Sequence, residues 1–540
     1  MKIMGSFLAR FGVLVVSSVI AYWLFQGALG ENTEGTVDTG VIEEVLEHIT
    51  EQFVDSVDQS ELVNSAIEAL VDGLDDPHTS FIDSREWESF RLQAGADSDY
   101  GGVGLEILKR DSLVTVITSI PGGPALRSGI RPGDRILSIE GVSAKDWDSD
   151  QVADVLRGKE GTDVNLSVNR PGVDKPISFQ LTRSVIELRS VPFKKLLKGS
   201  VGYIPLQVFS ETSGREVAEA LMLLREQGMK SLILDLRDNP GGLLIEGVAV
   251  TDLFLKDQLI ILETKGQSSR EEERIESATV ESNADLSLVV LVNEGSASSS
   301  EIVAGALQDH DRALIIGNRT YGKGSVQTLY TLSGGDVLKL TTARWYTPVG
   351  RSIHMDPEEQ MELRSSESSK LALNGRMVML DDLDGRPIVK SVGGRNLYGG
   401  GGITPDISVL HDTLSSIEEE AVQGILRSTG SFTASLFNYA IKYIQDNPNL
   451  LGVVQLKDSE LNLFYENLLK DSESRLERST LESGRRFIKY QLEREIALRA
   501  WGPEGAFEQT WSTDSQILRA LEVLERAKSP EQLVKATVSH

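Results

Sequence analysis

A buried strand that leads directly into a cluster of serines is the segment that most constrains this chain. Residues 286–292 are apolar apart from one serine, and they predict a strand inside a sheet. The small-residue turn EGSASSS follows, and a helix is predicted from Glu301 to Leu307. Residues 232–236 predict a second buried strand, which is followed by the turn DNPGG. Buried strands that alternate with helices favour an α/β fold in which helices cover a sheet.

The composition is typical of a multidomain globular protein and excludes several classes of function. A chain of 540 residues is long enough for roughly two to four domains. Its formal net charge of −27 disfavours a nucleic-acid surface, which needs clustered Lys and Arg, so no nucleic-acid partner is expected. The absence of cysteine excludes a disulfide framework, a thiol nucleophile and a Cys-based zinc site. No metal-ligand spacing stands out, and we expect neither a metal nor another cofactor.

The N-terminus predicts export. Lys2 and Arg10 precede an uncharged run over residues 11–30. Basic residues before such a run keep the N-terminus in the cytoplasm and direct the rest of the chain across the membrane. Ala28-Leu29-Gly30 offers a cleavage site, which favours a signal peptide over residues 1–30. An uncleaved membrane anchor is the alternative, because the run approaches the ~20 residues needed to span a bilayer.

Changes in residue pattern divide the remaining chain into four regions. Residues 38–97 carry apolar side chains at helical spacing and predict a helical N-terminal region. Residues 98–184 predict about five strands and one helix, which is a small β-rich module. Residues 185–411 predict the α/β core, and residues 412–540 predict a helical C-terminal extension.

The predicted core contains a polar and irregular segment at residues 355–397. Its Ser/Glu and Asp/Gly clusters are typical of a surface loop. We expect an insertion there, with residues 377–380 and 387–391 forming a pair of strands.

Ser298 is a candidate nucleophile within the serine turn. The spacing Ser298-x-x-Glu301 fits a capping box, in which the two side chains bind backbone amides at a helix start. Taken alone, a helix cap is the simpler interpretation. The N-terminus of a helix also suits a catalytic serine, because its free N–H groups stabilise a developing oxyanion. The GxSxG turn of α/β-hydrolases is absent, so the local pattern leaves both interpretations open.

Lys323 is the matching candidate for a general base. It lies between two glycines in the segment YGKGSVQ, four residues before Gln327. A lysine in a turn is normally solvated, whereas a general base needs burial to lower a pKa of ~10.4 towards neutrality. Gln327 returns to the same face at i+4, and its amide can orient an amine without restoring the positive charge. A Ser–Lys pair is a known variant of the serine-nucleophile arrangement.

Two further features bear on this candidate site. The turn at residues 239–242, Asn-Pro-Gly-Gly, follows a buried strand, and a glycine turn there can direct a backbone N–H towards a substrate carbonyl. Its alternative interpretation is an ordinary loop. A Ser–His triad through His310 or His354 is the alternative to the lysine, because His310 is the histidine nearest the serines in sequence.

Seven motifs, taken in order, resemble those of the carboxy-terminal processing proteases, also called tail-specific proteases. The resemblance covers about residues 40–410 nearly continuously. Each motif is weak alone, and their shared order makes the resemblance specific. They are LDDPHTS at 74–80, GGVGL at 101–105, GDRILSIEG at 133–141, DLRDNPGG at 235–242, the segment around Ser298, GKGSVQ at 322–327 and GGITPD at 401–406.

The resemblance implies a serine endopeptidase that cleaves exported proteins near their C-termini and has a core of the ClpP/crotonase type. The family often has alanine at the position of Ser299. The implied site residues are the nucleophile Ser298, the base Lys323 assisted by Gln327, and an oxyanion hole built from the amides of Ser299 and of Gly241 or Gly242.

The module at residues 98–184 resembles a PDZ domain. Its glycine loop, Gly102-Val103-Gly104-Leu105, offers backbone amides that can capture a chain-terminal carboxylate. The resemblance implies that the module binds the C-terminal tails of protein substrates and gates the active site; assembly or autoinhibition is the alternative use. A periplasmic location, soluble or anchored to the inner membrane, is implied as well. The helical termini suit a homodimer or the docking of an adaptor protein.

Two alternatives belong to other classes of protein. A catalytically silent PDZ scaffold that keeps the protease fold would have no need of an intact Ser298, Lys323 and Gln327. An acyl-CoA enzyme of the crotonase type shares the strand, glycine turn and helix plan. Such an enzyme would leave the Ser–Lys pair and the PDZ-like module without a task.

Overall fold

The chain divides into two compact units, Met1–Asp75 and Asp76–His540. The predicted signal peptide or membrane anchor at residues 1–30 lies outside the described residues. Of the helices that are described, none combines the length and the hydropathy needed to cross a bilayer. The computed structural model describes residues 39–535 apart from 85, 88–99, 111, 187–188, 268–271, 279–282, 357–358, 360–368, 380–384, 429–431, 472–475 and 528.

The described part of the first unit consists of two helices, α2 (Gly40–Gln52) and α3 (Gln59–Asp72). Asp58 begins α3 by accepting hydrogen bonds from the backbone N–H groups of Ser60 and Glu61. Apolar side chains recur along both helices at helical spacing, and those of Val41, Val45 and Leu70 are more than half exposed.

Residues 100–182 form a small β-rich module in which a strand order of β3-β4-β5-β8-β9 leaves β3 at the edge of the sheet. Val164, Leu166 and Val168 alternate with polar residues along β8, and their side chains are buried in the core of the module. The elements are β2 (Tyr100–Gly101), β3 (Leu105–Arg110), β4 (Leu113–Ser119), α5 (Pro124–Arg127), β5 (Arg135–Ile139), β6 (Val142–Ser143), α6 (Ser149–Leu156), β7 (Gly158–Lys159), β8 (Asp163–Asn169) and β9 (Ile177–Thr182).

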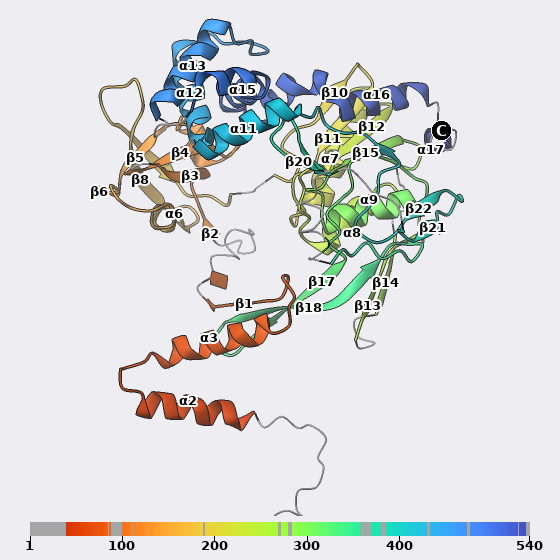
Figure 1. Cartoon of the computed structure of the whole chain (residues 1–540), viewed down its shortest axis with the longest axis horizontal. Helices are drawn as coiled ribbons and strands as arrows, with labels where there is room; N and C mark the ends of the chain where they lie inside the picture. Colours follow the sequence, from red (N-terminus) through yellow and green to blue (C-terminus); the bar gives the residue numbers. More distant parts are fainter. Residues whose placement is uncertain are drawn as a thin grey trace, which may run out of the picture. The chain divides into compact units, whose positions relative to one another are not determined.

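The main sheet of the second unit has the order β10-β11-β12-β15-β16-β23, and Figure 1 labels its strands β10, β11, β12 and β15. Strands β11 to β23 are parallel, and β10 is antiparallel to β11. Leu232 and Leu234 of β12 pack with helices α7 to α9, whereas Ile233 packs on the opposite face with α16. The elements are β10 (Lys195–Leu197), β11 (Val201–Pro205), α7 (Ser213–Glu226), β12 (Ser231–Asp235), α8 (Leu244–Asp252), β15 (Ser287–Val292), α9 (Ser299–Asp309), β16 (Leu314–Gly317) and β23 (Ile407–Ser408).

A second sheet carries the segment that follows Lys323. Its order is β1-β18-β13-β14, and β17 also pairs with β18. Strand β1 comes from residues for which the sequence predicted helix only, and it pairs with β18 through Ser80 and Lys339. The elements are β1 (Ser80–Ile82), β13 (Ile260–Gly266), β14 (Glu273–Glu276), β17 (Ser325–Thr331) and β18 (Val337–Tyr346).

The polar insert contains strands where they were expected, but the expected pairing between them is wrong. β20 (Met377–Met379) pairs with β19 (Ser369–Leu371), and β21 (Ile388–Lys390) pairs with β22 (Asn396–Tyr398). Each strand finds its partner across a short local turn that contains a glycine at positive φ, Gly375 at 89° or Gly394 at 91°. Such glycines favour tight hairpins, so local pairing takes precedence over pairing across the longer segment.

The C-terminal region is helical and has two packing surfaces. Helices α11 to α15 share an apolar core of their own, whereas α16 packs on the main sheet. Helix α15 bends at Gly502, where φ is 72°, just before Pro503. The helices are α11 (Ser416–Ser428), α12 (Phe432–Asp446), α13 (Asp458–Asp471), α14 (Arg478–Ser483), α15 (Arg485–Thr510), α16 (Ser515–Arg526) and α17 (Pro530–Lys535).

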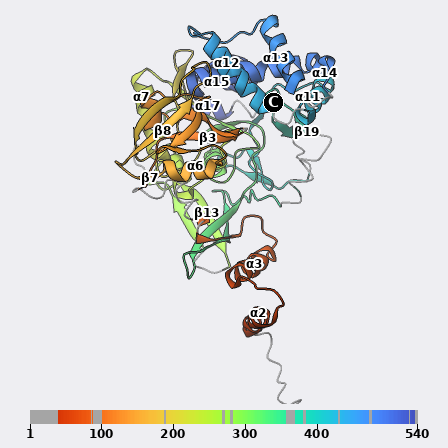
Figure 2. The same ribbon diagram turned by 90° about the vertical axis from the view of Figure 1, so that its left-hand side faces the viewer.

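Helices α12 and α15 contact the β-rich module through hydrogen bonds (Figure 2). The centre of the buried Phe437 ring lies 4.2 Å from the guanidinium carbon of Arg110 and 5.2 Å from that of Arg499. Arg110 also donates a hydrogen bond to the carbonyl of Ala434, and Arg499 donates one to the carbonyl of Ile117 at 2.9 Å. Cation–π contacts of this kind stabilise by about 1 kcal/mol each when they are partly desolvated.

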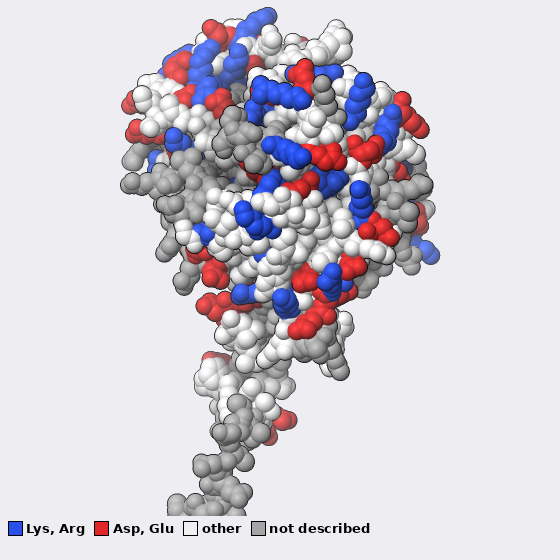
Figure 3. All heavy atoms as spheres, turned by 90° about the vertical axis from the view of Figure 1, so that its right-hand side faces the viewer, with Lys and Arg blue, Asp and Glu red and all other residues white. Residues whose placement is uncertain are grey.

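Acidic and basic side chains are interspersed on the face shown in Figure 3, and no continuous basic surface is visible on that face.

Candidate active site

Ser298 lies at the junction between strand β15 and helix α9, with φ at 53° and ψ at −115°. A positive φ at a residue other than glycine is costly and is frequent at functional sites. The two serines that follow are fully buried, and their hydroxyls donate to backbone carbonyls. The Ser299 hydroxyl donates to the carbonyl of Gly242 at 3.2 Å, and that of Ser300 to Asn239 at 2.9 Å. Ser298 is therefore the partly exposed member of the three consecutive serines.

The buried carboxylate of Glu301 connects the serine turn to the lysine segment. Its Oε2 atom accepts hydrogen bonds from the backbone N–H groups of both Ser298 and Lys323, each at 2.9 Å. Its Oε1 atom accepts from the N–H of Gly322 at 2.7 Å and from the hydroxyl of Thr320 at 2.5 Å. Two segments more than twenty residues apart in sequence thus meet at one carboxylate.

Burial raises the pKa of Glu301 to about 7, although the hydrogen bonds from Thr320, Gly322, Lys323 and Ser298 oppose the rise. All four partners donate, and only the ionised carboxylate accepts from all of them without conflict. Protonation of Glu301 would therefore weaken the connection between the serine turn and the lysine segment.

The backbone around Lys323 is tightly enclosed. Its carbonyl accepts a hydrogen bond from the indole N–H of Trp345 at 3.1 Å, and Trp345 is buried. Gly322 has φ at 90°, and a Cβ atom at that position would lie 2.8 Å from Met355 Cβ. A Cβ atom at Gly324 would lie 3.0 Å from His354 Cβ, so both glycines permit an approach that other residues would block.

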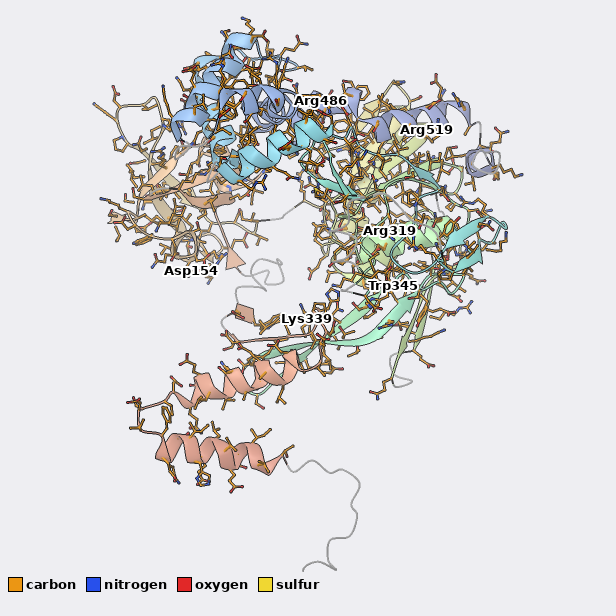
Figure 4. All side chains as sticks on the ribbon, in the orientation of Figure 1. Asp154, Arg319, Lys339, Trp345, Arg486 and Arg519 are labelled. Atoms are coloured by element: carbon orange, nitrogen blue, oxygen red, sulfur yellow. The ribbon has the colours of Figure 1, made fainter. Side chains whose placement is uncertain are left out.

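Lys323 has a pKa below the ordinary value for lysine. Burial of the amine is the main cause, and the positive charge of Lys339 adds to it. The carboxylates of Glu301 and Asp76 act in the opposite direction. Figure 4 shows Lys339 and Trp345 on strand β18, which pairs with β17 in the long hairpin.

Gln327 lies on β17, directly opposite Thr341 of β18. Its amide Nε2 donates to the hydroxyl of Ser325 at 2.9 Å and to that of Thr341 at 3.2 Å. Lys323 precedes the first residue of β17, and the pairing of β17 with β18 shifts register between Val326 and Gln327.

The glycine turn lies against the serine. A Cβ atom at Gly241 would be 2.7 Å from Ser298 Cβ and 3.0 Å from the backbone nitrogen of Ser299, and φ at Gly241 is 95°. The N–H of Gly241 donates to Asn239 Oδ1 at 2.9 Å. Gly242 forms a parallel bridge with Phe209. The structure thus brings together Ser298, Ser299 and both glycines.

The two histidines considered as alternatives lie in different places. His310 follows the last residue of α9, roughly 16 Å along the helix axis from its first turn, and its Nε2 contacts the carbonyl of Ile260 at 2.7 Å. The structure therefore does not place His310 with Ser298. His354 lies against Gly324, and burial followed by the charge of Arg344 lowers its pKa.

The predicted tail-binding loop lies between β2 and β3 of the β-rich module. Gly104 has φ at 74°, and a Cβ atom there would lie 3.2 Å from the Cα atom of Gly123. The N–H of Gly102 donates to the carbonyl of Ser184 at 2.9 Å, so this amide is already engaged within the module. Val103 and Leu105 complete the loop at the start of the edge strand β3.

The sequence pattern marks Glu301 only as half of a capping box, and it does not single out Thr341 or Trp345. The capping spacing was a signal for Glu301, since it placed a carboxylate beside the serine turn. Thr341 and Trp345 lie on a strand whose register depends on long-range pairing, and no local motif marks them.

Three family models match the chain. Residues 200–360 match "Peptidase family S41", residues 115–170 match "PDZ domain", and residues 26–86 match "Activating protease CtpB N-terminal domain". A carboxy-terminal-processing protease of Bartonella bacilliformis is 36% identical over 314 residues, which are 57% of this chain and 71% of that protein. A probable CtpA-like serine protease of Staphylococcus aureus is 33% identical over 377 residues, 69% of this chain and 75% of that protein.

The photosystem II D1 C-terminal processing protease is 29% identical, with 68% of this chain and 86% of that chain covered and a TM-score of 0.36.

Proposed function

Because the chain belongs to the carboxy-terminal processing proteases of peptidase family S41, we propose that it cuts exported proteins near their C-termini with a Ser298–Lys323 dyad. The observation that carries this proposal is the Glu301 carboxylate, which accepts hydrogen bonds from the backbones of both residues. The burial that lowers the pKa of Lys323 supports its role as a neutral base. The Ser299 and Ser300 hydroxyls are bound to carbonyls, which supports Ser298 as the nucleophile.

In the proposed mechanism, the neutral amine of Lys323 accepts the hydroxyl proton of Ser298 as its oxygen attacks the scissile carbonyl carbon. The resulting tetrahedral intermediate collapses, the C–N bond breaks, and the Lys323 ammonium gives its proton to the departing amine. Lys323 then accepts a proton from water, which attacks the acyl-enzyme. Collapse of the second intermediate releases the new C-terminus and returns the proton to Ser298.

The oxyanion of both intermediates would lie between backbone N–H groups. The amide of Ser299 is in the first turn of α9, where the helix dipole favours a negative charge. The N–H of Gly241 is engaged by Asn239, so we infer that Gly242 supplies the second donor. A donor of this kind contributes about 3 kcal/mol to transition-state stabilisation.

We further infer that the core is of the ClpP/crotonase type, supported by its parallel sheet with α8 and α9 beginning beside the glycine and serine turns. A silent scaffold would require none of the enclosure around Lys323. An acyl-CoA enzyme would have no use for the PDZ module. Export to the periplasm, a homodimer and an adaptor remain parts of this proposal that rest on the sequence.

The PDZ module would select substrates and gate the site. Strand β3 lies at the sheet edge directly after the glycine loop, so a tail with its carboxylate at the loop can extend the sheet along β3. The contacts of Phe437 with Arg110 and Arg499 would set the position from which the module delivers the tail.

Amidation of the substrate C-terminus is expected to raise KM about tenfold and to leave kcat nearly unchanged. A carboxylate receives charge-assisted hydrogen bonds from loop amides, and a neutral amide gives up about 1.5 kcal/mol of that binding. Steady-state cleavage of one peptide with either a free or an amidated end checks this expectation. Equal KM values would show that the loop does not read the carboxylate.

The proposal as a whole is tested with a folded protein that carries an unstructured, tagged tail. Mass spectrometry of the products should find cuts within the tail and none in the folded part. The same incubation with Ser298→Ala should leave the tail intact. An uncut tail with the parent protein would favour the silent scaffold.

A further inference from the structure

The turn at residues 76–79 belongs to the motif LDDPHTS, and none of its residues takes part in the proposed mechanism. The carboxylate of Asp76 accepts hydrogen bonds from the hydroxyl of Thr79 at 2.6 Å and from the N–H of His78 at 3.1 Å. The Thr79 oxygen in turn accepts from the N–H of Thr341 at 3.1 Å, and β1 then pairs with β18. These contacts fix Asp76 against the strand that lies opposite Gln327.

The hydroxyl of Thr341 connects Asp76 to Gln327. Burial of Asp76 opposes its ionisation, but hydrogen bonds from Thr341 and Thr79 outweigh burial and hold its pKa below the ordinary value. A carboxylate can only accept, so the single hydroxyl proton of Thr341 points to Asp76. The Thr341 oxygen is then left as an acceptor, which is how Gln327 Nε2 uses it at 3.2 Å.

These hydrogen bonds determine whether the oxygen or the nitrogen of the Gln327 amide faces Thr341. The oxygen and nitrogen of an amide are distinguished by their partners, and Ser325 alone could act as donor or acceptor. The Asp76 carboxylate removes that ambiguity. It accepts the one hydroxyl proton of Thr341, so the Thr341 oxygen can only accept from Gln327, and the group that contacts it is the NH2 donor. The NH2 group of Gln327 is therefore directed towards Ser325 and Thr341, and the carbonyl oxygen lies on the other side of the amide.

We propose that Asp76 and Thr341 are positioning residues that orient the Gln327 amide so that its carbonyl oxygen accepts a hydrogen bond from the Lys323 amine. The proposal rests on the proposed function of Lys323 as the base. Lys323 lies two residues before Ser325, whose hydroxyl accepts a hydrogen bond from the Gln327 amide at 2.9 Å, and the negative charge of Asp76 acts on the pKa of Lys323.

The proposed hydrogen bond would orient the Lys323 amine for proton transfer. A neutral amine that donates one N–H to a fixed oxygen has fewer orientations, so its lone pair can be held towards Ser298. The same oxygen stabilises the ammonium that forms during proton transfer. Charged or titratable groups that act on the Lys323 amine are Asp76 before β1, Lys339 on β18 and Glu301 on α9, and His78 is influenced in turn by Lys323 and His354.

Thr341→Val removes the hydroxyl and keeps the shape of the side chain. We expect it to lower kcat about tenfold with KM unchanged, because an oriented base contributes more than this to proton transfer. The acid limb of the kcat profile should move to lower pH, since the ammonium of Lys323 loses an acceptor. Thr341→Ser should recover kcat to within about twofold of the parent.

Thr342→Val is the matched control. The Thr342 hydroxyl lies 2.7 Å from that of Thr328, a neighbouring cross-strand contact on the same hairpin that does not involve Gln327. We expect this variant to keep kcat within about twofold and to leave the pH profile in place. Asp76→Asn is a second test that does not depend on the folding of Thr341→Val. Its amide can donate to Thr341, so kcat should again fall about tenfold.

Equal kcat values and equal pH profiles for Thr341→Val and Thr342→Val would overturn the positioning role, provided that the parent still cuts in a Ser298-dependent manner. Loss of the proposed protease function would appear differently, as absence of Ser298-dependent cleavage in the parent itself. An unchanged kcat in Asp76→Asn would also contradict the proposal.

Discussion

Ser298→Ala and Lys323→Ala are each expected to lower kcat for tail cleavage by at least about a thousandfold. The first removes the atom that forms the acyl-enzyme, and the second removes the base that activates it. The two residues act as one unit, so the double variant should be little worse than either single variant. Steady-state cleavage of the tagged tail, with the folded state checked by circular dichroism, measures these effects.

Two further variants sharpen this result. Lys323→Arg keeps a positive charge at all accessible pH values, because arginine has a pKa above ~12, and it should therefore be inactive throughout. Ser299→Ala keeps the main-chain amide and should retain activity within about tenfold of the parent. A Ser299→Ala variant as inactive as Ser298→Ala would contradict the assignment of the nucleophile.

The pH dependence of the parent follows from the state of Lys323. Burial, with help from Lys339, lowers the pKa of the amine, and the neutral form is the active one. Activity should therefore rise with pH and be lost as the pH falls through the lowered pKa of Lys323. The Glu301 carboxyl, with a pKa raised to about 7, loses its ionised form over the acidic side of neutrality and should steepen that loss.

Glu301→Gln is expected to lower kcat about a hundredfold, the second largest effect of a single substitution. The amide has one acceptor oxygen in place of two, and its NH2 group must face backbone N–H groups that now lack a partner. A buried unpaired donor costs about 1–3 kcal/mol. To avoid that cost, the serine turn and the lysine segment would move apart. The measurement is kcat for tail cleavage, at a temperature where the variant is folded.

Asp309→Asn serves as the control for Glu301→Gln. Asp309 is a fully buried carboxylate in the same helix, and it pairs with Arg351 and with the N–H of Val349. This variant should lose stability without a comparable loss of kcat, because Asp309 touches neither Ser298 nor Lys323. Equal losses of kcat in the two variants would show that Glu301 contributes to catalysis only by stabilising the fold.

The sequence predicted those parts of the site that depend on local chain geometry. The strand, serine turn and helix around Ser298 are contiguous, and their residue types alone indicate the turn. The glycines on either side of Lys323 likewise indicate a close approach of the backbone to its neighbours, and the structure shows that approach at Met355 and His354. Local patterns suffice where the determining contacts lie within a few residues.

Other parts depend on contacts that a single sequence does not reveal. Glu301 meets Thr320, Gly322 and Lys323 only because β16 and the following loop return to the start of α9. The link from Asp76 to Gln327 requires β1 to pair with β18, and a three-residue strand gives too weak a pattern to predict its register. In the insert, the strands were predicted but the glycine turns that decide their pairing were not recognised.

The most direct test of the dyad is to map the acyl-enzyme. The protein is mixed with an excess of an N-acylated peptide p-nitrophenyl ester at alkaline pH, quenched with acid and examined by intact-mass and peptide-level mass spectrometry. We predict one acyl group, attached to Ser298, which forms much more slowly in Lys323→Ala and is absent from Ser298→Ala. An acyl group on Ser299 or Ser300, or equal labelling of Ser298→Ala, would contradict the account.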